Sequence, residues 1–250
     1  MKINDDGLSI IIPSLNESEN IRLIISQFKP LLKQYDYPIE VIIVDGPSNK
    51  ESKEILYEVF RSIGEEDIKL IEMDKMKGYG HDIIFGVNSS KYPNIAWTHA
   101  DMQTDIHDVF NIFNKHKAKL STSIIKGKRR KRKLMDSILT LGMQFFVIML
   151  LRVNIQDINA QPKIFSRSFF IKYISKDYPN DFSLDLYLLY MAKQNNYEII
   201  EEPVNFNKRL YGEAKGGGGS IKNRIALINR TFKYILKLRE KIDHSKQSEH

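Results

Sequence analysis

Short apolar runs alternate with helix-like patterns through the first half of the chain, and this alternation limits the fold more than any other feature. Between the runs, apolar residues recur at spacings of three and four, which is typical of amphipathic helices. Uninterrupted apolar strands separated by such helices predict an α/β fold with a mostly parallel sheet and helices on both faces. The five runs are Leu8–Ile12, Val41–Val44, Ile68–Ile71, Asn94–Thr98 and Leu120–Ile125.

The second half of the chain is less regular. A strongly apolar stretch, 134–153, is interrupted by polar residues and is better suited to a buried or interface-lying helix than to a membrane span, which needs about 20 apolar residues. Further elements are predicted at 163–165, 184–191, 199–206 and 221–242. We expect one domain over residues 1–220 and a basic amphipathic helix with a tail over 221–250. Four glycines precede Ser220 and match a common engineered linker, but we interpret them as native because no second folded module follows.

Composition narrows the classes of protein that remain. The chain has 250 residues, 42% of them hydrophobic, and can bury a sizeable core. It has no cysteine, which excludes disulfides and thiolate metal sites. Without a recognisable leader, the expected location is the cytoplasm. The net charge of +7 favours polyanionic partners, namely nucleic acid, an anionic membrane or a phosphorylated substrate.

Polar turns follow three of the predicted strands, where ligands bind in open parallel sheets. These turns are Pro13–Glu17, Asp45–Ser48 and His99–Gln103. In the last, alternating His99, Asp101 and Gln103 could hold a divalent cation together with diphosphate oxygens. The alternative is that Asp101, Thr104 or Asp105 caps the next helix. Likewise, Asn16 with Glu19 resembles a capping box for the first helix.

A glycine turn at Lys77, Gly78 and Gly80 precedes a predicted helix and suits the approach of a phosphate or sugar. The third glycine of a dinucleotide fingerprint would fall on Ile83, so an NAD-dependent enzyme is disfavoured.

Taken in order, these motifs resemble those of family 2 glycosyltransferases with the GT-A fold. Pro13–Glu17 resembles the P-x-x-N-E start, Val44–Ser48 the V-D-D/G-x-S turn, and His99–Gln103 the D-A-D-L-Q metal motif. The region from Asp157 to Ser166 and the ending from Glu202 to Lys215 look like the dolichol-phosphate or polyprenyl-phosphate sugar transferase branch.

The resemblance implies an inverting, metal-dependent hexosyltransferase of cell-surface glycan synthesis that uses a nucleotide-diphosphate sugar and a polyprenyl-phosphate or lipid-linked sugar acceptor. It implies that Asp101 and Gln103, with His99, hold Mg²⁺ or Mn²⁺ at the donor diphosphate. The implied donor-binding residues are Pro13, Asn16, Glu17, Asp45, Lys77, Gly78, Gly80, Asp101, Arg209 and Lys215.

Two departures from the family pattern affect the predicted chemistry. His99 replaces the first aspartate of the metal motif, and imidazole would favour Mn²⁺ over Mg²⁺ unless Asp101 alone anchors the metal. Gln161 and Pro162 replace a glycine motif on the acceptor side. A sugar hydroxyl acceptor would need a base, for which Asp185 and Asp157 are candidate catalytic residues, whereas an ionised phosphate would need none. Alternatively, Asp185 is a solvated residue of the predicted helix or a cap near its start.

The basic run 126–133 directly precedes the apolar stretch. A polybasic segment beside an apolar helix suits the inner face of an anionic membrane, and Lys128, Arg129, Arg130 and Arg132 are the predicted contacts. The alternatives are a nucleic-acid-binding protein that uses this run, or a nucleotidyltransferase. Nucleic acid is disfavoured because the run carries no aromatic residues for stacking. Self-association into a homo-oligomer stays open.

Overall fold

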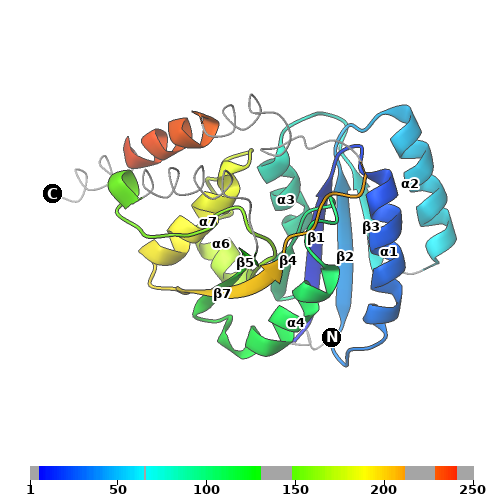
Figure 1. Ribbon diagram of the computed structural model, residues 1–250, viewed down its shortest axis with the longest axis horizontal. Coiled ribbons are helices and arrows are strands. Elements are labelled where there is room, and N and C mark those ends of the chain that lie inside the picture. The colour runs from blue at the N-terminus through cyan, green and yellow to red at the C-terminus, as the bar shows by residue number, and fades with distance from the viewer. Residues whose placement is uncertain (1–5, 65, 131–147, 212–228, 241–250) are drawn as a thin grey trace.

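The computed structural model describes residues 6–64, 66–130, 148–211 and 229–240. Within these ranges, seven strands form one sheet in the order β3-β2-β1-β4-β6-β5-β7 (Figure 1). The strands are β1 (Leu8–Ser14), β2 (Ile39–Asp45), β3 (Ile68–Glu72), β4 (Asn94–Trp97), β5 (Ser123–Arg130), β6 (Lys163–Ser166) and β7 (Glu198–Asn205).

Neighbouring strands run parallel except at β6, which is antiparallel to both β4 and β5. The prediction of a mostly parallel sheet is therefore confirmed. The first 125 residues do not complete the sheet by themselves, because β6 comes from the second half of the chain and lies between β4 and β5.

Helices cover both faces of the sheet, as the alternating pattern predicted. Strand side chains alternate between two cores: Ile11 of β1 packs with residues of α3, α6 and α7, whereas Ile10 and Ile12 pack with residues of α1, α2 and α4. Because both of their faces are buried, the central strands β1, β2 and β4 are mostly apolar. The helices are α1 (Ser18–Leu32), α2 (Lys50–Ile63), α3 (Tyr79–Asn88), α4 (Ile106–His116), α6 (Arg167–Tyr173) and α7 (Ser183–Gln194), with a 3₁₀ turn at Lys117–Lys119.

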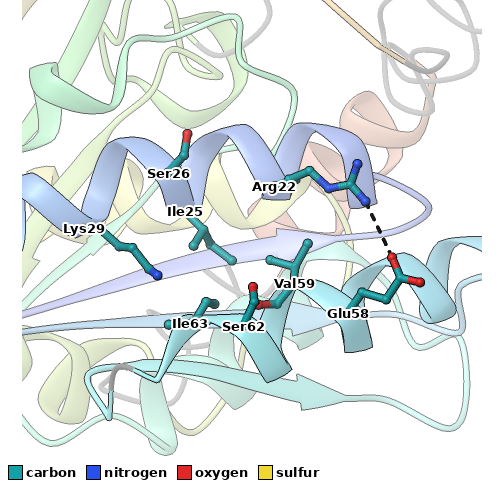
Figure 2. Close-up of a pocket in the computed structure, with 8 residues that line it drawn as sticks. All are labelled: Arg22, Ile25, Ser26, Lys29, Glu58, Val59, Ser62 and Ile63. Atoms are coloured by element: carbon teal, nitrogen blue, oxygen red, sulfur yellow. Dashed lines mark hydrogen bonds and ion pairs between the residues drawn. The ribbon is translucent and has the colours of Figure 1, made fainter.

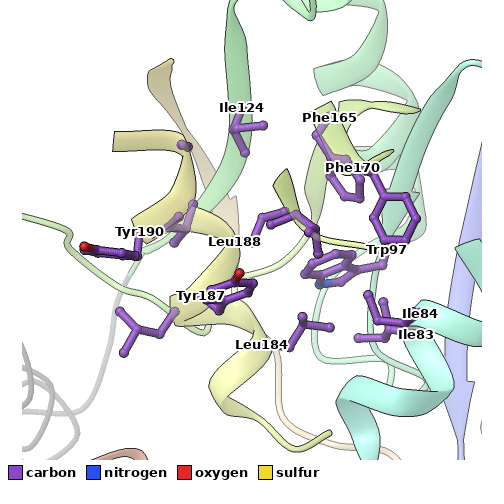
Figure 3. Packing of buried hydrophobic residues seen from close by; sticks show 14 of the residues in the cluster. Ile83, Ile84, Trp97, Ile124, Phe165, Phe170, Leu184, Tyr187, Leu188 and Tyr190 are labelled. Carbon is purple, nitrogen blue, oxygen red and sulfur yellow. The ribbon is translucent and has the colours of Figure 1, made fainter. Parts of the chain in front are cut away.

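The core on the α3 side joins the two halves of the chain (Figure 3). Trp97 of β4 packs edge-on against Phe165 of β6, with ring centroids 5.2 Å apart. Ile83 and Ile84 of α3 and Leu184 of α7 belong to the same cluster. This shared core fixes α7 relative to the strands that carry the predicted site.

Two local predictions are wrong. Asn16 does not cap α1: the helix begins at Ser18, Glu17 precedes it without a side-chain cap, and the Asn16 side chain bonds elsewhere. The fifth strand does not end at Ile125 but continues to Arg130, so the first basic residues of the 126–133 run belong to β5. The strand extends because β7 pairs with it residue by residue from Ser123 to Arg130.

Most of the apolar stretch 134–153 lies outside the described residues. The part that is described begins at residue 148, and residues 148–151 are helical. The predicted final helix is described only over 229–240, where it is helical. In the described ranges, no helix combines the length and the apolar character that crossing a membrane requires.

Candidate functional site

The site lies at the edge of the sheet where the parallel strands end. Strands β1, β2, β4 and β5 all point their carboxyl ends to this edge, and the antiparallel β6 begins there. Lys163 of β6 is in register with Trp97 of β4 on one side and Lys126 of β5 on the other. The strand-end motifs predicted from the sequence, together with the start of β6, are therefore gathered at one edge.

Asp45, at the end of β2, is a buried carboxylate surrounded by hydroxyl groups. Its Oδ1 accepts hydrogen bonds from Ser14 Oγ and Ser48 Oγ, each at 2.9 Å. Its Oδ2 has no hydrogen-bond partner among the described residues. Burial raises the pKa of Asp45 to about 6, although the two serine hydroxyls oppose the shift. A buried acceptor oxygen without a partner suits a ligand that donates a hydrogen bond.

Asn16 joins the loops that follow β1 and β2. Its backbone is left-handed, with φ of 52°, and its side-chain oxygen accepts from the Asn49 amide at 2.7 Å. The backbone N–H of Asn16 donates to Ser48 Oγ at 2.8 Å. Pro13 lies just before, paired with Val44 of β2. These contacts hold the predicted donor-binding loops together around Asp45.

Asp101 lies in the turn between β4 and α4. Asp105, rather than Asp101, caps α4, because its Oδ1 accepts from the His107 amide at 2.9 Å. The turn is not the extended segment that the sequence suggested, since Met102 has a φ of 58°. Asp101 and Gln103 are nevertheless adjacent: Asp101 Oδ1 accepts from the Gln103 amide at 3.1 Å. The capping alternative for Asp101 is therefore excluded in this structure.

His99 belongs to a hydrogen-bonded chain that runs from the turn to α7. Its Nε2 lies 3.0 Å from the Tyr79 hydroxyl and 3.3 Å from Gln161 Nε2. Gln161 Nε2 donates to Asp185 Oδ1 at 2.9 Å, and Lys163 Nζ donates to the same oxygen at 2.7 Å. The side chains of Asp185 and Lys163 are both 0% exposed. The predicted metal motif and the candidate base Asp185 are thus parts of one network.

The residues of the turn fit a divalent cation that also binds a diphosphate. A carboxylate from Asp101 and an amide oxygen from Gln103 are hard oxygen donors, which Mg²⁺ and Mn²⁺ accept. In the described part of the chain, no three His, Cys, Asp or Glu side chains form a cluster of metal ligands. Such a sparse donor set suits a cation that takes most of its ligands from substrate phosphates and water.

The glycines before α3 are needed by the protein's own backbone. A Cβ on Gly78, whose φ is 113°, would come within 2.3 Å of the Asn180 carbonyl oxygen. A Cβ on Gly80 would come within 2.3 Å of the Pro179 carbonyl oxygen. The Gly80 and His81 amides donate to the Asn180 carbonyl, so these two amides are already occupied. Lys77, just before the turn, is exposed.

Asp157, the other candidate base, forms an ion pair with Arg129 of β5. The Arg129 amide donates to Asp157 Oδ2 at 2.9 Å and its Nε donates to Oδ1 at 3.0 Å. Lys126 is fully buried, and its ammonium group donates to the Gly127 and Asp157 carbonyls and pairs with Glu201. Burial, followed by the charge of Lys163, lowers the pKa of Lys126 to about 8.

Arg209, after β7, reaches back to the first loop of the chain. Its guanidinium forms an ion pair with Glu17 and donates to the Tyr211 carbonyl. Asn20 bonds both the Glu17 carboxylate and the Tyr211 carbonyl. The predicted donor-binding residues Glu17 and Arg209, 192 positions apart, are therefore in direct contact.

The predicted membrane contacts differ in whether their charged groups have partners within the protein. Lys128 donates to Glu201 at 2.8 Å, and Arg129 pairs with Asp157 and lies over the Phe206 ring. Arg130 is exposed at the end of β5. Arg132 lies outside the described residues, as does Lys215, which was predicted to bind the donor.

A hollow of about 370 Å³ lies between α1 and α2, away from the strand-end motifs (Figure 2). Arg22 and Lys29 of α1 and Glu58 and Ser62 of α2 are among the residues that line it. None of the predicted site residues lines it.

Sequence reasoning missed three residues of the site: Tyr79, Gln161 and Lys163. Tyr79 lies between the two glycines of the turn, and its ring stacks on that of Phe182 with centroids 4.3 Å apart. Gln161 was noted only as a departure from a family motif. A lysine inside a short apolar run, as Lys163 is, could have suggested a buried partner carboxylate.

Comparison with known proteins shows which family this chain is similar to. The family model described as Glycosyl transferase family 2 matches residues 9–181. The dolichyl-phosphate beta-glucosyltransferase of Homo sapiens is 23% identical over 218 residues, which cover 80% of this chain and 67% of that protein. The enzyme of the same name from Dictyostelium discoideum is 23% identical over 251 residues, covering 94% of this chain and 76% of that protein.

Solved structures share the fold at low sequence identity. Glucosyl-3-phosphoglycerate synthase from Mycobacterium tuberculosis, in complex with Mn²⁺, UDP-glucose and phosphoglyceric acid, superposes with a TM-score of 0.72 and 12% identity. The match covers 94% of this chain and 80% of that chain. The same enzyme with Mg²⁺ and UDP gives a TM-score of 0.67 at 12% identity, over 93% of this chain and 79% of that one. The expected GT-A fold is confirmed.

Proposed function

This chain belongs to glycosyl transferase family 2, and we propose that it transfers a hexose, with inversion, from a nucleotide-diphosphate sugar to a polyprenyl phosphate at the cytoplasmic face of a membrane. One observation carries the proposal: Asp45 and Asp101 lie at the ends of β2 and β4, on either side of β1, at the ligand-binding edge of the sheet. Among the described residues, neither carboxylate forms an ion pair with a lysine or an arginine.

The donor would lie across these two carboxylates. The partnerless Asp45 Oδ2 would accept a hydrogen bond from the base or ribose, in a pocket whose loops Asn16 holds together. Asp101 and Gln103 would hold the divalent cation, which, when bound, offsets the negative charge of the departing diphosphate. Arg209, which pairs with Glu17 of the first loop, would also offset this charge.

The reaction is a single displacement. An acceptor oxygen forms a bond to the anomeric carbon while the bond from that carbon to the diphosphate oxygen breaks. The electron pair of the broken bond leaves with the nucleoside diphosphate, and the configuration at the anomeric carbon is inverted. The protein contributes by holding donor and acceptor in line.

Two contacts favour a phosphate as acceptor over a sugar hydroxyl. A hydroxyl needs a base to take its proton, but Asp185 is buried against Lys163 and Asp157 is paired with Arg129. An ionised phosphate brings a deprotonated oxygen and needs no base. The curated relatives carry dolichyl phosphate in their names, and the polyprenyl phosphate proposed here has the same chemistry.

The described part of the basic run supports a smaller membrane contact than the sequence suggested. Lys126 is buried, while Lys128 and Arg129 have carboxylate partners, which leaves the exposed Arg130 as the described residue of the run best placed to meet an anionic lipid. The same pairing weakens the nucleic-acid alternative, which relied on the whole run.

The proposal is tested by incubating the protein with Mg²⁺, detergent-solubilised polyprenyl phosphate and radiolabelled UDP-, GDP- or dTDP-hexoses. We expect one donor to pass label into the lipid fraction and the Asp101→Ala variant to pass none. A protein that consumes no donor and binds no nucleotide, but binds RNA tightly in low salt, would contradict the proposal.

A further inference from the structure

Residues 206–211, termed the strap, follow β7 and cross the ligand-binding edge of the sheet (Figure 1). The Asn207 amide donates to the Gln103 carbonyl at 2.8 Å, and the Asn207 carbonyl accepts from Gln103 Nε2 at 3.2 Å. Two residues further along, Arg209 forms its ion pair with Glu17. The strap is therefore fixed both to the turn after β4 and to the loop after β1.

The side chains that the strap exposes are apolar or basic. Phe206, Leu210 and Tyr211 are 39%, 60% and 51% exposed, respectively. They are three of the ten large apolar side chains that are exposed in the described ranges, although the strap is only six residues long. Lys208 lies between them and is also exposed. Single exposed apolar residues are ordinary, but such a concentration indicates a binding surface.

The charge around this surface is positive. Arg130, at the end of β5, is in register with Asn205, the residue just before the strap. Arg130 and Lys208 are exposed, and neither forms an ion pair with another described residue. The described carboxylates that contact the strap or the end of β5 are paired within the protein, Glu17 with Arg209, Asp157 with Arg129 and Glu201 with Lys128.

We propose that the strap, together with Arg130, is the surface by which this chain docks on an anionic phospholipid bilayer. Phe206, Leu210 and Tyr211 would enter the boundary between head groups and acyl chains, where aromatic and aliphatic side chains are favoured. Lys208 and Arg130 would keep their charges at the level of the lipid phosphates. Leu210, the most exposed of the three apolar residues, cannot stack on a base, which favours lipid over nucleic acid as the partner.

The inference rests on the proposed function, because it names the membrane partner of the same site. The strap holds Gln103 and Glu17, so a bilayer bound to the strap would lie at the rim of the site. The phosphate of a polyprenyl phosphate lies in the head-group layer of that bilayer. Docking through the strap would therefore bring the acceptor phosphate to the donor, and it assigns the membrane contact to a segment outside the basic run.

The chain allows a direct test because its single tryptophan, Trp97, is buried. A second tryptophan is introduced as Leu210→Trp. The matched control is Ile171→Trp, because Ile171 is 58% exposed and lies on α6, which follows β6 at the opposite edge of the sheet. Both variants are mixed with vesicles of phosphatidylcholine and phosphatidylglycerol, without donor or acceptor.

We expect the Leu210→Trp emission to shift to shorter wavelength and to be quenched by lipids brominated on their acyl chains. The Ile171→Trp emission should stay unchanged. An unchanged Leu210→Trp spectrum on vesicles that sediment the protein would overturn the proposal, as would a chain that does not sediment with these vesicles at all.

Sedimentation with vesicles separates the apolar contribution from the charged one. Leu210→Ser should weaken binding by about fivefold or more, against less than about twofold for Ile171→Ser. Lys208→Gln should weaken binding to anionic vesicles by about fivefold in low salt and have little effect in 1 M salt. Because these side chains are exposed, the urea midpoints of the variants should stay unchanged.

Equal vesicle binding by Leu210→Ser and the unmodified protein would overturn the proposal. If Leu210→Ser changes only the oligomeric state, the strap is a contact between copies of the chain, and if it weakens only RNA binding, the strap binds nucleic acid; either result overturns the proposal. A chain that docks through the strap but transfers no hexose would contradict the proposed function and leave the docking surface supported.

Discussion

Asp45 and Asp101, at the ends of strands in one half of the sheet, have different partners from Asp185 and Asp157 in the other half. In the half formed by β1 to β4, Asp45 and Asp101 are held by hydroxyl groups and amides. In the half formed by β5 to β7, Asp185 is paired with Lys163 and Asp157 with Arg129. The first arrangement leaves negative charge for a ligand to complement, whereas the second neutralises it within the protein. We infer that the first half binds donor and cation and that the second half is built for stability and acceptor placement.

The largest effect is expected from breaking the buried pair in the second half. Lys163→Met leaves the Asp185 carboxylate buried without its cation, which should lower the free energy of unfolding by about 3–5 kcal/mol in urea titrations. The double variant Lys163→Met with Asp185→Leu should recover much of this loss. Arg22→Ala, which removes an exposed pair on α1, should cost less than about 0.5 kcal/mol. A loss of the same size for Lys163→Met would mean that the buried pair contributes no more to stability than the exposed one.

Asp101→Ala should remove function and spare the fold. Because the site then lacks its carboxylate, we expect turnover to fall by about 100-fold or more, with an unchanged urea midpoint. Asp105→Ala is the matched control: it removes the cap of α4 and should cost about 1 kcal/mol of stability while transfer continues. Equal turnover in both variants would refute the placement of the cation at Asp101.

Asp45 should make the protein less stable as the pH rises. Its pKa is about 6 in the folded state and about 3.9 when unfolded. Between these values the folded state holds the proton and the unfolded state releases it, so stability falls as the pH rises through this window, by on the order of 2 kcal/mol. In Asp45→Asn this fall should disappear, leaving a higher urea midpoint at pH 7.5 but weaker nucleotide binding. If stability between pH 4 and pH 6 depends on pH in Asp45→Asn as it does in the unmodified protein, Asp45 is not the group whose buried carboxyl titrates there.

The smallest effect concerns the membrane. Arg130→Gln should weaken binding to vesicles that contain anionic lipid by about fivefold, corresponding to about 1 kcal/mol for one basic residue near the surface. Arg61→Gln, an exposed arginine on α2, serves as the control and should bind as the unmodified protein does. If both variants sediment equally with vesicles, the contact lies elsewhere on the molecule.

The first half of the fold could be predicted because its strands and helices obey simple periodicities. Strands β1, β2 and β4 are buried on both faces and consist mainly of apolar residues, and the turn motifs after them lie at the sheet edge. In the second half, the predicted elements at 163–165, 184–191 and 199–206 are confirmed as β6, α7 and β7. The extension of β5 could not be predicted, because the strand continues through Lys126 and Arg129, whose charges are paired with Glu201 and Asp157. Those partners are distant in sequence.

The same limit applies to the site. Asp45 and Asp101 could be located from strand ends, and Asp101 from a motif. The role of Asn16 could not, because its side chain bonds the Asn49 amide across two loops. His99 resembled a ligand by spacing, whereas its contacts with Tyr79 and Gln161 could not be predicted, because these residues come from other parts of the chain.

The central claim is that the carboxylates of the first half bind a nucleoside diphosphate together with a divalent cation. Calorimetric titration of UDP, GDP and dTDP tests it in the presence of Mg²⁺ and again with EDTA. We predict that one nucleotide binds with Mg²⁺, and that EDTA or Asp101→Ala weakens it by about 10-fold or more. Binding of equal strength in EDTA, or no binding of any of the three nucleotides, would contradict the account.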